Sequence, residues 1–299
     1  MSAPTPHARA HSPAHPFAHT LALARSLLFV PGNRPERFAK ALASGADTVI
    51  IDFEDAVAPA DKLAARQMLE ASWDDFSAAE RSRIALRINA AGTPWHEDDL
   101  LFLAGLGVLG VVLPKAESAS QLAHAAELLG PSCVLVPLIE SVAGLDALDA
   151  LARSPQVVRL AFGNLDFQAD VAMACSIDES ELAPVRLGLV LASRRAELPA
   201  PIDGVTASLK DAAQLAFDAG RSRRMGFGAK LCIHPSQVAP VNTAFGVAAA
   251  ELDWAQRVMK AFDAAGGGVA SLDGRMVDAP VMRHAQRLLR TYTQHGKNQ

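Results

Sequence analysis

The chain has 299 residues, of which 50% are hydrophobic and 20% charged, and its formal net charge is −4. This length fits one large α/β domain or two smaller ones, and the small net charge without a Lys/Arg run argues against a nucleic-acid partner. No apolar run reaches the roughly 18 residues that span a bilayer, and three widely spaced cysteines indicate reduced thiols in a cytoplasmic protein.

The N-terminal segment, residues 1–24, differs in composition from the rest of the chain. It mixes Pro, Ala, Ser and His without an apolar period, so we predict a flexible tail. Histidines recur every four residues from His7 to His19 and would line one face of a helix. Pro13 and Pro16 interrupt that helix, so we favour a tail without function over a metal site.

From Arg25 onward, short apolar runs typical of strands alternate with longer amphipathic runs typical of helices. The predicted strands cover residues 26–32, 48–53, 84–89, 110–115, 133–140 and 157–163, with weaker candidates at 201–205 and 229–235. Apolar strands that do not alternate are buried on both faces, which is typical of a parallel sheet. We therefore predict an α/β fold, a (β/α)8 TIM barrel over residues 25–248, with a doubly wound sheet of fewer strands as the alternative.

A C-terminal helical extension, residues 249–299, follows the predicted barrel. It contains an amphipathic helix at 251–268, then a short extended piece, a turn and a last helix. A barrel does not need these residues to close. They form either a lid over their own barrel or an arm that reaches a neighbouring subunit.

Polar residues follow nearly every predicted strand at its C-terminal end. In chain order they are Asn33, then Asp52, Glu54 and Asp55, then Arg87 and Asn89, then Lys115, Glu140, Asp166, Asp203 and His234. Active sites of (β/α)8 enzymes lie at this end of the barrel and draw residues from several strands. The pattern indicates an enzyme.

Glu140 and Asp166 end neighbouring strands, which lie about 4.8 Å apart in a sheet, so the two carboxylates can converge on one cation. Two carboxylates without a nearby His or Cys favour Mg²⁺ over Zn²⁺. Its open positions suit a 2-oxo acid, whose keto and carboxylate oxygens chelate the metal. The alternative is that both carboxylates pair with Arg87 and Lys115 and bind no metal.

Arg87 can hold a substrate carboxylate through two hydrogen bonds. The alternative partners are Glu54 and Asp55, and both roles can hold at once. The acidic cluster then holds Arg87 and shapes the surroundings of the metal.

Several sequence motifs carry a resemblance to a known family. They are "RSLLFVPGNRPERFAKALASGADTVIIDFEDAVAPADKLAAR", "ALRINA", "VVLPKAES", "VPLIESVAGL", "FGNLDF", "HPSQV" and "DGRMVDAPV". In this order, over about residues 25–290, they resemble the citrate lyase beta subunit family, part of the wider HpcH/HpaI aldolase group. The resemblance implies a (β/α)8 barrel with a C-terminal extension, Mg²⁺ as cofactor, and cleavage or formation of a C–C bond in a CoA thioester.

The resemblance also implies roles for individual residues. Glu140 and Asp166 match the metal ligands, and Arg87 matches the group that clamps the substrate carboxylate. Asp278, in "GRMVDAP", matches the acid/base that family members bring from a neighbouring subunit, which implies a homo-oligomer, commonly a trimer.

The substrate-binding positions follow from the same resemblance. The backbone of Gly163, Asn164 and Leu165 would bind the oxygens of the 2-oxo acid, and Glu54 and Asp55 would lie at the same site. Phe162 and Leu165 are candidates for shaping the acid pocket.

The expected reaction splits a 3-hydroxyacyl-CoA, such as citramalyl-CoA or malyl-CoA, into acetyl-CoA and a 2-oxo acid. One alternative is the beta subunit of a citrate lyase complex, which acts on a citryl thioester of an acyl carrier protein. A pyruvate-type aldolase that needs no CoA, and a non-enzymatic acyl-CoA-binding protein, are further alternatives.

Overall fold

The computed structural model describes residues 16–266 and 268–296, and in them eight parallel strands close into a barrel. The strands are β1 (Ser26–Pro31), β2 (Thr48–Asp52), β3 (Ile84–Arg87), β4 (Gly110–Leu113), β5 (Val134–Ile139), β6 (Ala161–Phe162), β7 (Ile202–Asp203) and β8 (Ala229–Cys232). Each strand pairs with the next in chain order, and β8 pairs with β1. The predicted (β/α)8 barrel is confirmed, and the doubly wound alternative is wrong.

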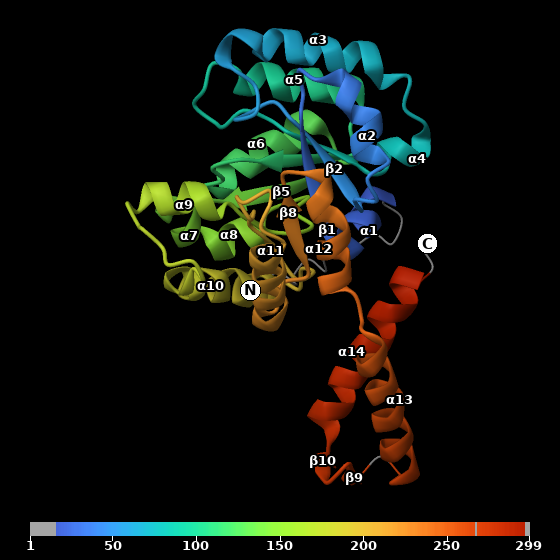
Figure 1. The fold of residues 1–299 in the computed structure, drawn as a ribbon. Helices are drawn as coiled ribbons and strands as arrows, with labels where there is room; N and C mark the ends of the chain where they lie inside the picture. Colours follow the sequence, from blue (N-terminus) through green and yellow to red (C-terminus); the bar gives the residue numbers. More distant parts are fainter. Residues whose placement is uncertain (1–15, 267, 297–299) are drawn as a thin grey trace, which may run out of the picture.

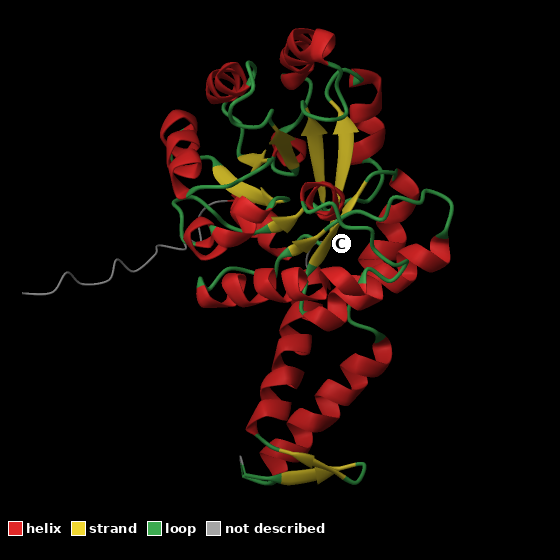
Figure 2. Ribbon diagram, turned by 90° about the vertical axis from the view of Figure 1, so that its left-hand side faces the viewer, coloured by secondary structure: helices red, strands yellow, loops and turns green. Residues whose placement is uncertain are grey.

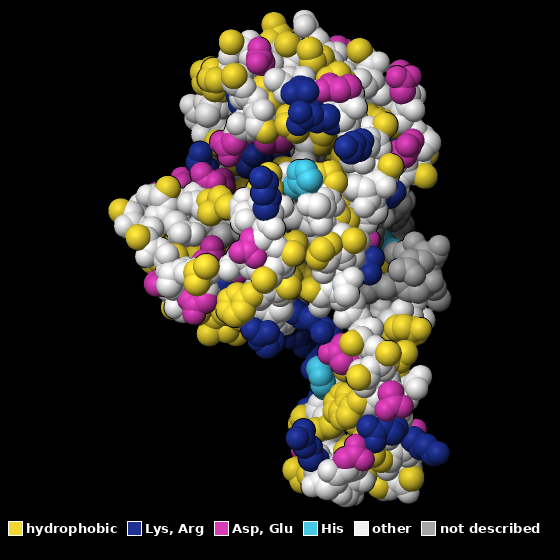
Figure 3. Space-filling view, in the orientation of Figure 1, with side chains coloured by type: hydrophobic (Ala, Val, Ile, Leu, Met, Phe, Trp, Pro, Cys, Tyr) yellow, Lys and Arg dark blue, Asp and Glu magenta, His cyan; other side chains and the backbone are white. Residues whose placement is uncertain are grey.

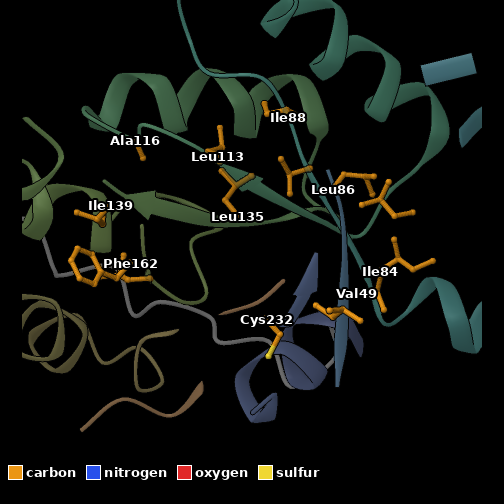
Figure 4. Packing of buried hydrophobic residues seen from close by; sticks show 14 of the residues in the cluster. Val49, Ile84, Leu86, Ile88, Leu113, Ala116, Leu135, Ile139, Phe162 and Cys232 are labelled. Carbon is orange, nitrogen blue, oxygen red and sulfur yellow. The ribbon is translucent and has the colours of Figure 1, made fainter. Parts of the chain in front are cut away.

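Helices surround this barrel (Figures 1 and 2). They are α2 (Phe38–Leu42), α3 (Lys62–Trp73), α4 (Ala78–Arg81), α5 (His96–Leu106), α6 (Ala119–Leu129), α7 (Val142–Asp146), α8 (Leu148–Ala152), α9 (Asn164–Asp170), α10 (Ala183–Arg195), α11 (Ala212–Met225) and α12 (Val238–Phe245), with short 3₁₀ turns at η1 (Pro35–Arg37), η2 (Pro59–Asp61), η3 (Ser180–Leu182) and η4 (Pro235–Gln237). Outward-facing strand residues such as Leu86, Leu113 and Leu135 pack into the core between strands and helices (Figure 4).

Successive side chains of a strand point to opposite faces, and this alternation places the polar strand ends. Ala85 on β3 and Leu138 on β5 belong to the cluster that fills the barrel interior. Two residues later come Arg87 and Glu140, which therefore face inward at the barrel mouth. In the same way, inward-facing Ile50 leads to Asp52.

Helix α1 (Pro16–Leu23) closes the opposite end of the barrel. Phe17 and Leu21 are fully buried and join the barrel-interior cluster. The Phe17 ring lies against Gly110, where an added Cβ would fall 2.0 Å from the ring. The prediction of a flexible tail up to residue 24 is therefore wrong for residues 16–24, because apolar residues inside the Pro- and His-rich segment are buried under the barrel. Residues 1–15, with His7, His11 and His15, lie outside the described residues.

Arg159 ties α1 to the barrel. Its Nη1 donates to the carbonyl oxygens of Leu21 and Ala24 at 2.8 and 2.7 Å, and its Nε donates to that of Ala200. The guanidinium is buried, and this burial lowers its pKa to about 9. A positive charge against carbonyls at a helix C-terminus is stabilised by the helix dipole.

The last part of the chain, from Ala249 onward, forms an arm that extends from the barrel. It consists of α13 (Ala249–Ala264), the two-stranded hairpin β9 (Ala270–Leu272) and β10 (Arg275–Val277), and α14 (Ala279–Gly296). The arm has a small hydrophobic core of its own, formed by Ala255, Val258, Val277 and Ala285. Figures 1 and 2 show the hairpin at the end of the arm farthest from the barrel, and in Figure 3 the arm projects as a separate column.

None of the described helices combines the length and the apolar character that a membrane span requires.

Candidate active site at the mouth of the barrel

A cavity of about 350 Å³ opens at the carboxyl ends of the barrel strands. It is lined by Phe29, Pro31, Asp52, Asp55, Ala56, Arg87, Leu138, Glu140, Phe162, Gly163, Asn164, Leu165, Asp166, Val205, Leu231 and Ile233. Most of the residues that the sequence singled out therefore meet at one place. Glu54 lies next to this group, and Asp278 lies in the arm.

Arg87 is held mainly by Asp52. Its Nε donates to Asp52 Oδ1 at 2.7 Å and its Nη2 donates to Oδ2 at 2.6 Å, with both side chains buried. The two residues are register partners on β2 and β3, which aligns their side chains. Glu54 and Asp55, the partners expected from sequence, lie 3.1 and 3.4 Å from Nη1, so they are secondary. The expected ion pair exists, but its strongest member is Asp52.

Glu54 is buried beside Arg87, and its Oε2 accepts no hydrogen bond. Its Oε1 lies 3.8 Å from Lys115 Nζ. Burial raises the pKa of this carboxyl to about 7, against the lowering effect of Arg87. Oε2 lies 3.1 Å from Arg87 Nη1, so the guanidinium is the cation that offsets the cost of burying this carboxyl group.

Glu140 is buried at the end of β5 and is placed by two backbone features. Its Oε1 accepts the backbone N–H of Lys115 at 2.7 Å, and Lys115 holds a left-handed φ of 45°. Gly163 leaves the space for the carboxylate, because an added Cβ would lie 2.4 Å from Glu140 Oε2. Burial, and next the charge of Glu54, raise the pKa of Glu140 to about 8.

The donor set fits a hard divalent cation held by few protein ligands. Glu140 and Asp166 line the same cavity, and the charge of Asp166 contributes to the raised pKa of Glu140. Among the described residues, no group of three or more His, Cys, Asp or Glu side chains forms a metal cage. Mg²⁺ commonly binds through one or two carboxylates and completes its shell with water and substrate oxygens. The space that Gly163 leaves for the Glu140 carboxylate, with Asp166 lining the same cavity, is consistent with such an ion.

The turn from Gly163 to Asp166 opens α9 and forms one wall of the cavity. Asn164 is anchored below it: its Oδ1 accepts the backbone N–H of Val205 at 2.9 Å. The side chain of Leu165 is half-exposed, whereas that of Asn164 is buried. The Asn164 side chain thus fixes the turn to the loop after β7, and the backbone N–H groups of the first turn have no partner within the helix.

Asp278 lies directly after β10 and caps α14, since its Oδ1 accepts the backbone N–H of Val281 at 3.2 Å. The hairpin that it follows, β9 and β10, lies at the end of the arm farthest from the barrel (Figure 1). The structure therefore does not bring Asp278 to the cavity of its own chain.

Some polar strand ends do not join the cavity. Asn89 donates to Asp99 at 2.6 Å, Asp203 faces outward and accepts from Arg186 at 3.0 Å, and exposed His234 lies 2.7 Å from Ser236 Oγ. The expectation that Asn89 and Asp203 contribute to the ring is wrong, and His234 is a hydrogen-bonded histidine at the end of its strand. The outward direction of Asp203 follows from the alternation of side chains along a strand, because the residue before it, Ile202, faces the barrel interior.

Sequence reasoning named Phe162 and Leu165 but missed the rest of the apolar wall of the cavity. Phe29, Leu138, Leu231 and Ile233 line it together with Val205. Counting every second residue along β1, β5 and β8 would have found most of them, because those positions share the inward face.

Comparisons with known proteins place these features in context. The sequence matches the model of the HpcH/HpaI aldolase/citrate lyase family over residues 25–235. It is 35% identical over 277 residues to a citrate lyase subunit beta-like protein of Deinococcus radiodurans, covering 90% of this chain and 97% of that protein. It is 33% identical over 268 residues to a (3S)-malyl-CoA thioesterase of Cereibacter sphaeroides, covering 89% and 90%. Among solved structures, Mycobacterium tuberculosis CitE in complex with magnesium, acetoacetate and coenzyme A has a TM-score of 0.80 and 34% identity, covering 91% of this chain and 99% of that one.

Proposed function

This chain belongs to the HpcH/HpaI aldolase/citrate lyase family, and from that premise we propose that it is a Mg²⁺-dependent carbon–carbon lyase. Its substrate is a 3-hydroxyacyl-CoA such as citramalyl-CoA or malyl-CoA, which it splits into acetyl-CoA and a 2-oxo acid. The observation that carries the proposal is the pair Glu140 and Asp166 at the mouth of the barrel, beside Arg87 and the Gly163 turn.

Glu140 and Asp166 are the groups that would hold Mg²⁺, which when bound polarises the oxygens of the 2-oxo acid and lowers the barrier to C–C cleavage. The backbone N–H groups of Asn164 and Leu165 supply hydrogen bonds to the acid's oxygens. Asp52 takes Nε and one hydrogen of Nη2 of Arg87, so a substrate carboxylate would bind at Nη1 in place of the weaker contacts with Glu54 and Asp55. These groups orient the hydroxy acid half of the substrate.

Cleavage moves two protons. One leaves the hydroxyl oxygen of C3 as the C2–C3 bond breaks, and one arrives at the methylene carbon that becomes the methyl group of acetyl-CoA. We assign the second transfer to Asp278 of a neighbouring subunit, because Asp278 directly follows β10 in the arm and is not among the residues that line its own cavity. The active protein is then a homo-oligomer, a trimer or a larger assembly.

The charge of the cavity supports a monocarboxylic 2-oxo acid, such as pyruvate or glyoxylate, as the product. The described lining residues carry four carboxyl groups and one guanidinium, and that guanidinium is already paired with Asp52. A second substrate carboxylate, as in oxaloacetate, would have no free lining cation to meet. Citramalyl-CoA and malyl-CoA therefore fit better than a citryl thioester.

A second candidate is thioester hydrolysis, favoured by the 33% identity to a (3S)-malyl-CoA thioesterase. Hydrolysis releases free CoA and leaves the C–C bond intact. The two reactions thus differ in their products, although they share the substrate.

The deciding experiment supplies citramalyl-CoA, malyl-CoA and citryl-CoA, with and without Mg²⁺. Acetyl-CoA and the 2-oxo acid are measured by coupled enzymes, and free CoA thiol is measured by a disulfide reagent. Mg²⁺-dependent formation of acetyl-CoA supports the lyase, and CoA thiol without 2-oxo acid supports the thioesterase. Turnover of none of the free CoA esters would favour the beta subunit of a citrate lyase complex.

A further inference from the structure

Glu179 lies outside the cavity lining, yet it holds the helix that forms one cavity wall. Asn164 Nδ2 donates to Glu179 Oε1 at 3.0 Å. Gln168 Nε2, one turn further along α9, lies 3.5 Å from the same oxygen and donates to the carbonyl oxygen of Asn164 at 3.0 Å. One carboxylate oxygen therefore contacts two side chains on one face of α9.

Two arginines hold the second carboxylate oxygen of Glu179. Arg186 on α10 donates to Oε2 through Nη2, and Arg221 on α11 approaches the same oxygen at 3.0 Å. Arg186 is fully buried and donates in turn through Nε to the buried Asp203 on β7. Arg186 thus links Asp203 on the barrel wall to Glu179, and Arg221 contacts Glu179 from a second helix.

The backbone at Glu179 is in a conformation that side chains disfavour. Its φ of 47° and ψ of 39° lie in the left-handed region. Residues without a turn-forming side chain adopt this region only where surrounding contacts over-determine it, and such positions cluster near functional sites. The contacts of both carboxylate oxygens account for the strained backbone.

The contacts around the side-chain amide of Asn164 fix its orientation. An added Cβ at Gly204 would lie 2.0 Å from Asn164 Oδ1, so this glycine admits the amide. The amide then accepts from Val205 N–H and donates to Glu179. Glu179 and the loop after β7 therefore hold Asn164 from two sides.

We propose that Glu179 is a positioning residue for the reaction at the barrel mouth. It fixes the Asn164 amide, and through it the turn from Gly163 to Asp166 that carries the backbone donors and one metal-binding carboxylate. This inference rests on the proposed function for its catalytic consequence, although the fixing of the turn does not depend on it.

The first test measures amide hydrogen exchange in the metal-free protein and its Glu179→Ala variant. Peptides that cover 163–170 should exchange faster in the variant, while peptides that cover α6 keep the wild-type rate. Leu189→Ala on α10 is the control, because it removes a buried apolar side chain near Arg186 and leaves the carboxylate in place. Unchanged exchange at 163–170 in Glu179→Ala would overturn the proposal.

The second test asks whether Glu179 acts through Asn164. Glu179→Ala should lower kcat about tenfold or more and weaken the affinity for Mn²⁺, used as a paramagnetic probe, with a smaller change in KM for the thioester. Adding Glu179→Ala to Asn164→Ala should cost nothing further, since both changes release the same turn. Multiplicative losses in the double variant would contradict the proposal.

Glu179→Gln separates positioning from a general loss of stability. It keeps an oxygen that can accept from Asn164 but weakens both arginine contacts. Its kcat and Mn²⁺ affinity should therefore recover toward the wild type even where its melting temperature does not. A kcat that follows melting temperature across all variants would overturn the positioning role. If the wild type cleaves no thioester, the proposed function fails, and exchange and Mn²⁺ affinity still decide the role of Glu179.

Discussion

Asp52 and Arg87 join β2 and β3 through two parallel hydrogen bonds of 2.7 and 2.6 Å at the mouth of the barrel. Both side chains are buried, and Asp52 also accepts the backbone N–H groups of Glu54 and Ala56. This pair therefore shapes the loop after β2 and fixes the orientation of the guanidinium in the cavity.

Asp52→Ala should lower the free energy of unfolding by about 3–5 kcal/mol, because it leaves the buried Arg87 without its main partner. Urea denaturation at neutral pH measures the change. Asp149→Ala is the matched control, since Asp149 pairs with Arg195 at 2.7 Å with both side chains half-exposed, and should cost below about 1 kcal/mol. An equal loss of unfolding free energy in the two variants would mean that the buried pair stabilises the protein no more than the exposed pair does.

Glu140→Gln should separate stability from metal binding. It keeps an oxygen for the Lys115 N–H and removes a carboxylate whose ionisation is unfavourable, so the metal-free variant should be at least as stable as the wild type at pH values above 8. Its Mg²⁺ affinity should fall by more than the roughly 10–100-fold typical of losing an outer-shell partner. Titration calorimetry and thermal melts measure both, and wild-type Mg²⁺ affinity would rule out Glu140 as a ligand.

The raised pKa values of Glu54 and Glu140, about 7 and about 8, predict how stability depends on pH. Folded-state values above the ordinary 4.5 mean that the folded protein binds more protons than the unfolded chain. The stability that the protonated forms of Glu54 and Glu140 contribute is fully present below about pH 4.5, and it is lost as the pH rises through 7 to 8. Mg²⁺ competes with these protons, so it should raise the melting temperature more at about pH 8.5 than at about pH 6. A shift that is equal at both pH values would argue that neither carboxyl meets the metal.

Gly163→Ala should abolish Mg²⁺ binding while the barrel stays folded. The new methyl group would lie 2.4 Å from Glu140 Oε2 and 2.6 Å from its Cβ, so the carboxylate must move. Gly188→Ala on α10 is the control, because its Cβ would meet only ordinary contacts at 3.7 and 3.8 Å. Calorimetry with circular dichroism tests both, and retained Mg²⁺ affinity in Gly163→Ala would contradict the assigned position of Glu140.

Asp278→Asn should lower kcat by roughly 10²–10⁴-fold with little change in melting temperature, because asparagine also caps helices. If Asp278 serves a neighbour, mixing unfolded Asp278→Asn and Glu140→Gln chains and refolding them together should restore part of the activity. Some mixed assemblies then contain an intact cavity beside an intact arm. Mixtures without regained activity, despite exchange of subunits, would place both residues in one chain's site.

The barrel and much of its mouth could be predicted because alternation and strand order are local properties of the sequence. Arg87 and Glu140 lie two residues beyond inward-facing apolar positions, so their direction follows from the pattern. The main partner of Arg87 could not be predicted, since Asp52, Glu54 and Asp55 lie within four residues and only the register with β3 selects Asp52.

Other features had no local signal. Glu179 lies in an irregular loop, and its contacts come from residues up to 42 positions away in the chain. Helix α1 has few residues, and its composition resembles the Pro-rich segment before it, although burial of Phe17 and Leu21 decides its structure. Contacts between residues far apart in the chain determine both features, and the periodicity of the sequence does not predict such contacts.

The attachment of α1 beneath the barrel has a practical consequence for protein engineering. An affinity tag or fusion partner added before Pro16 joins the chain at the end of the barrel opposite the cavity, so it leaves the mouth of the barrel open. A chain that begins at Arg25 instead lacks the carbonyl groups of Leu21 and Ala24, which leaves the buried Arg159 guanidinium without these two hydrogen-bond acceptors. Tags are therefore better added ahead of α1 than substituted for it.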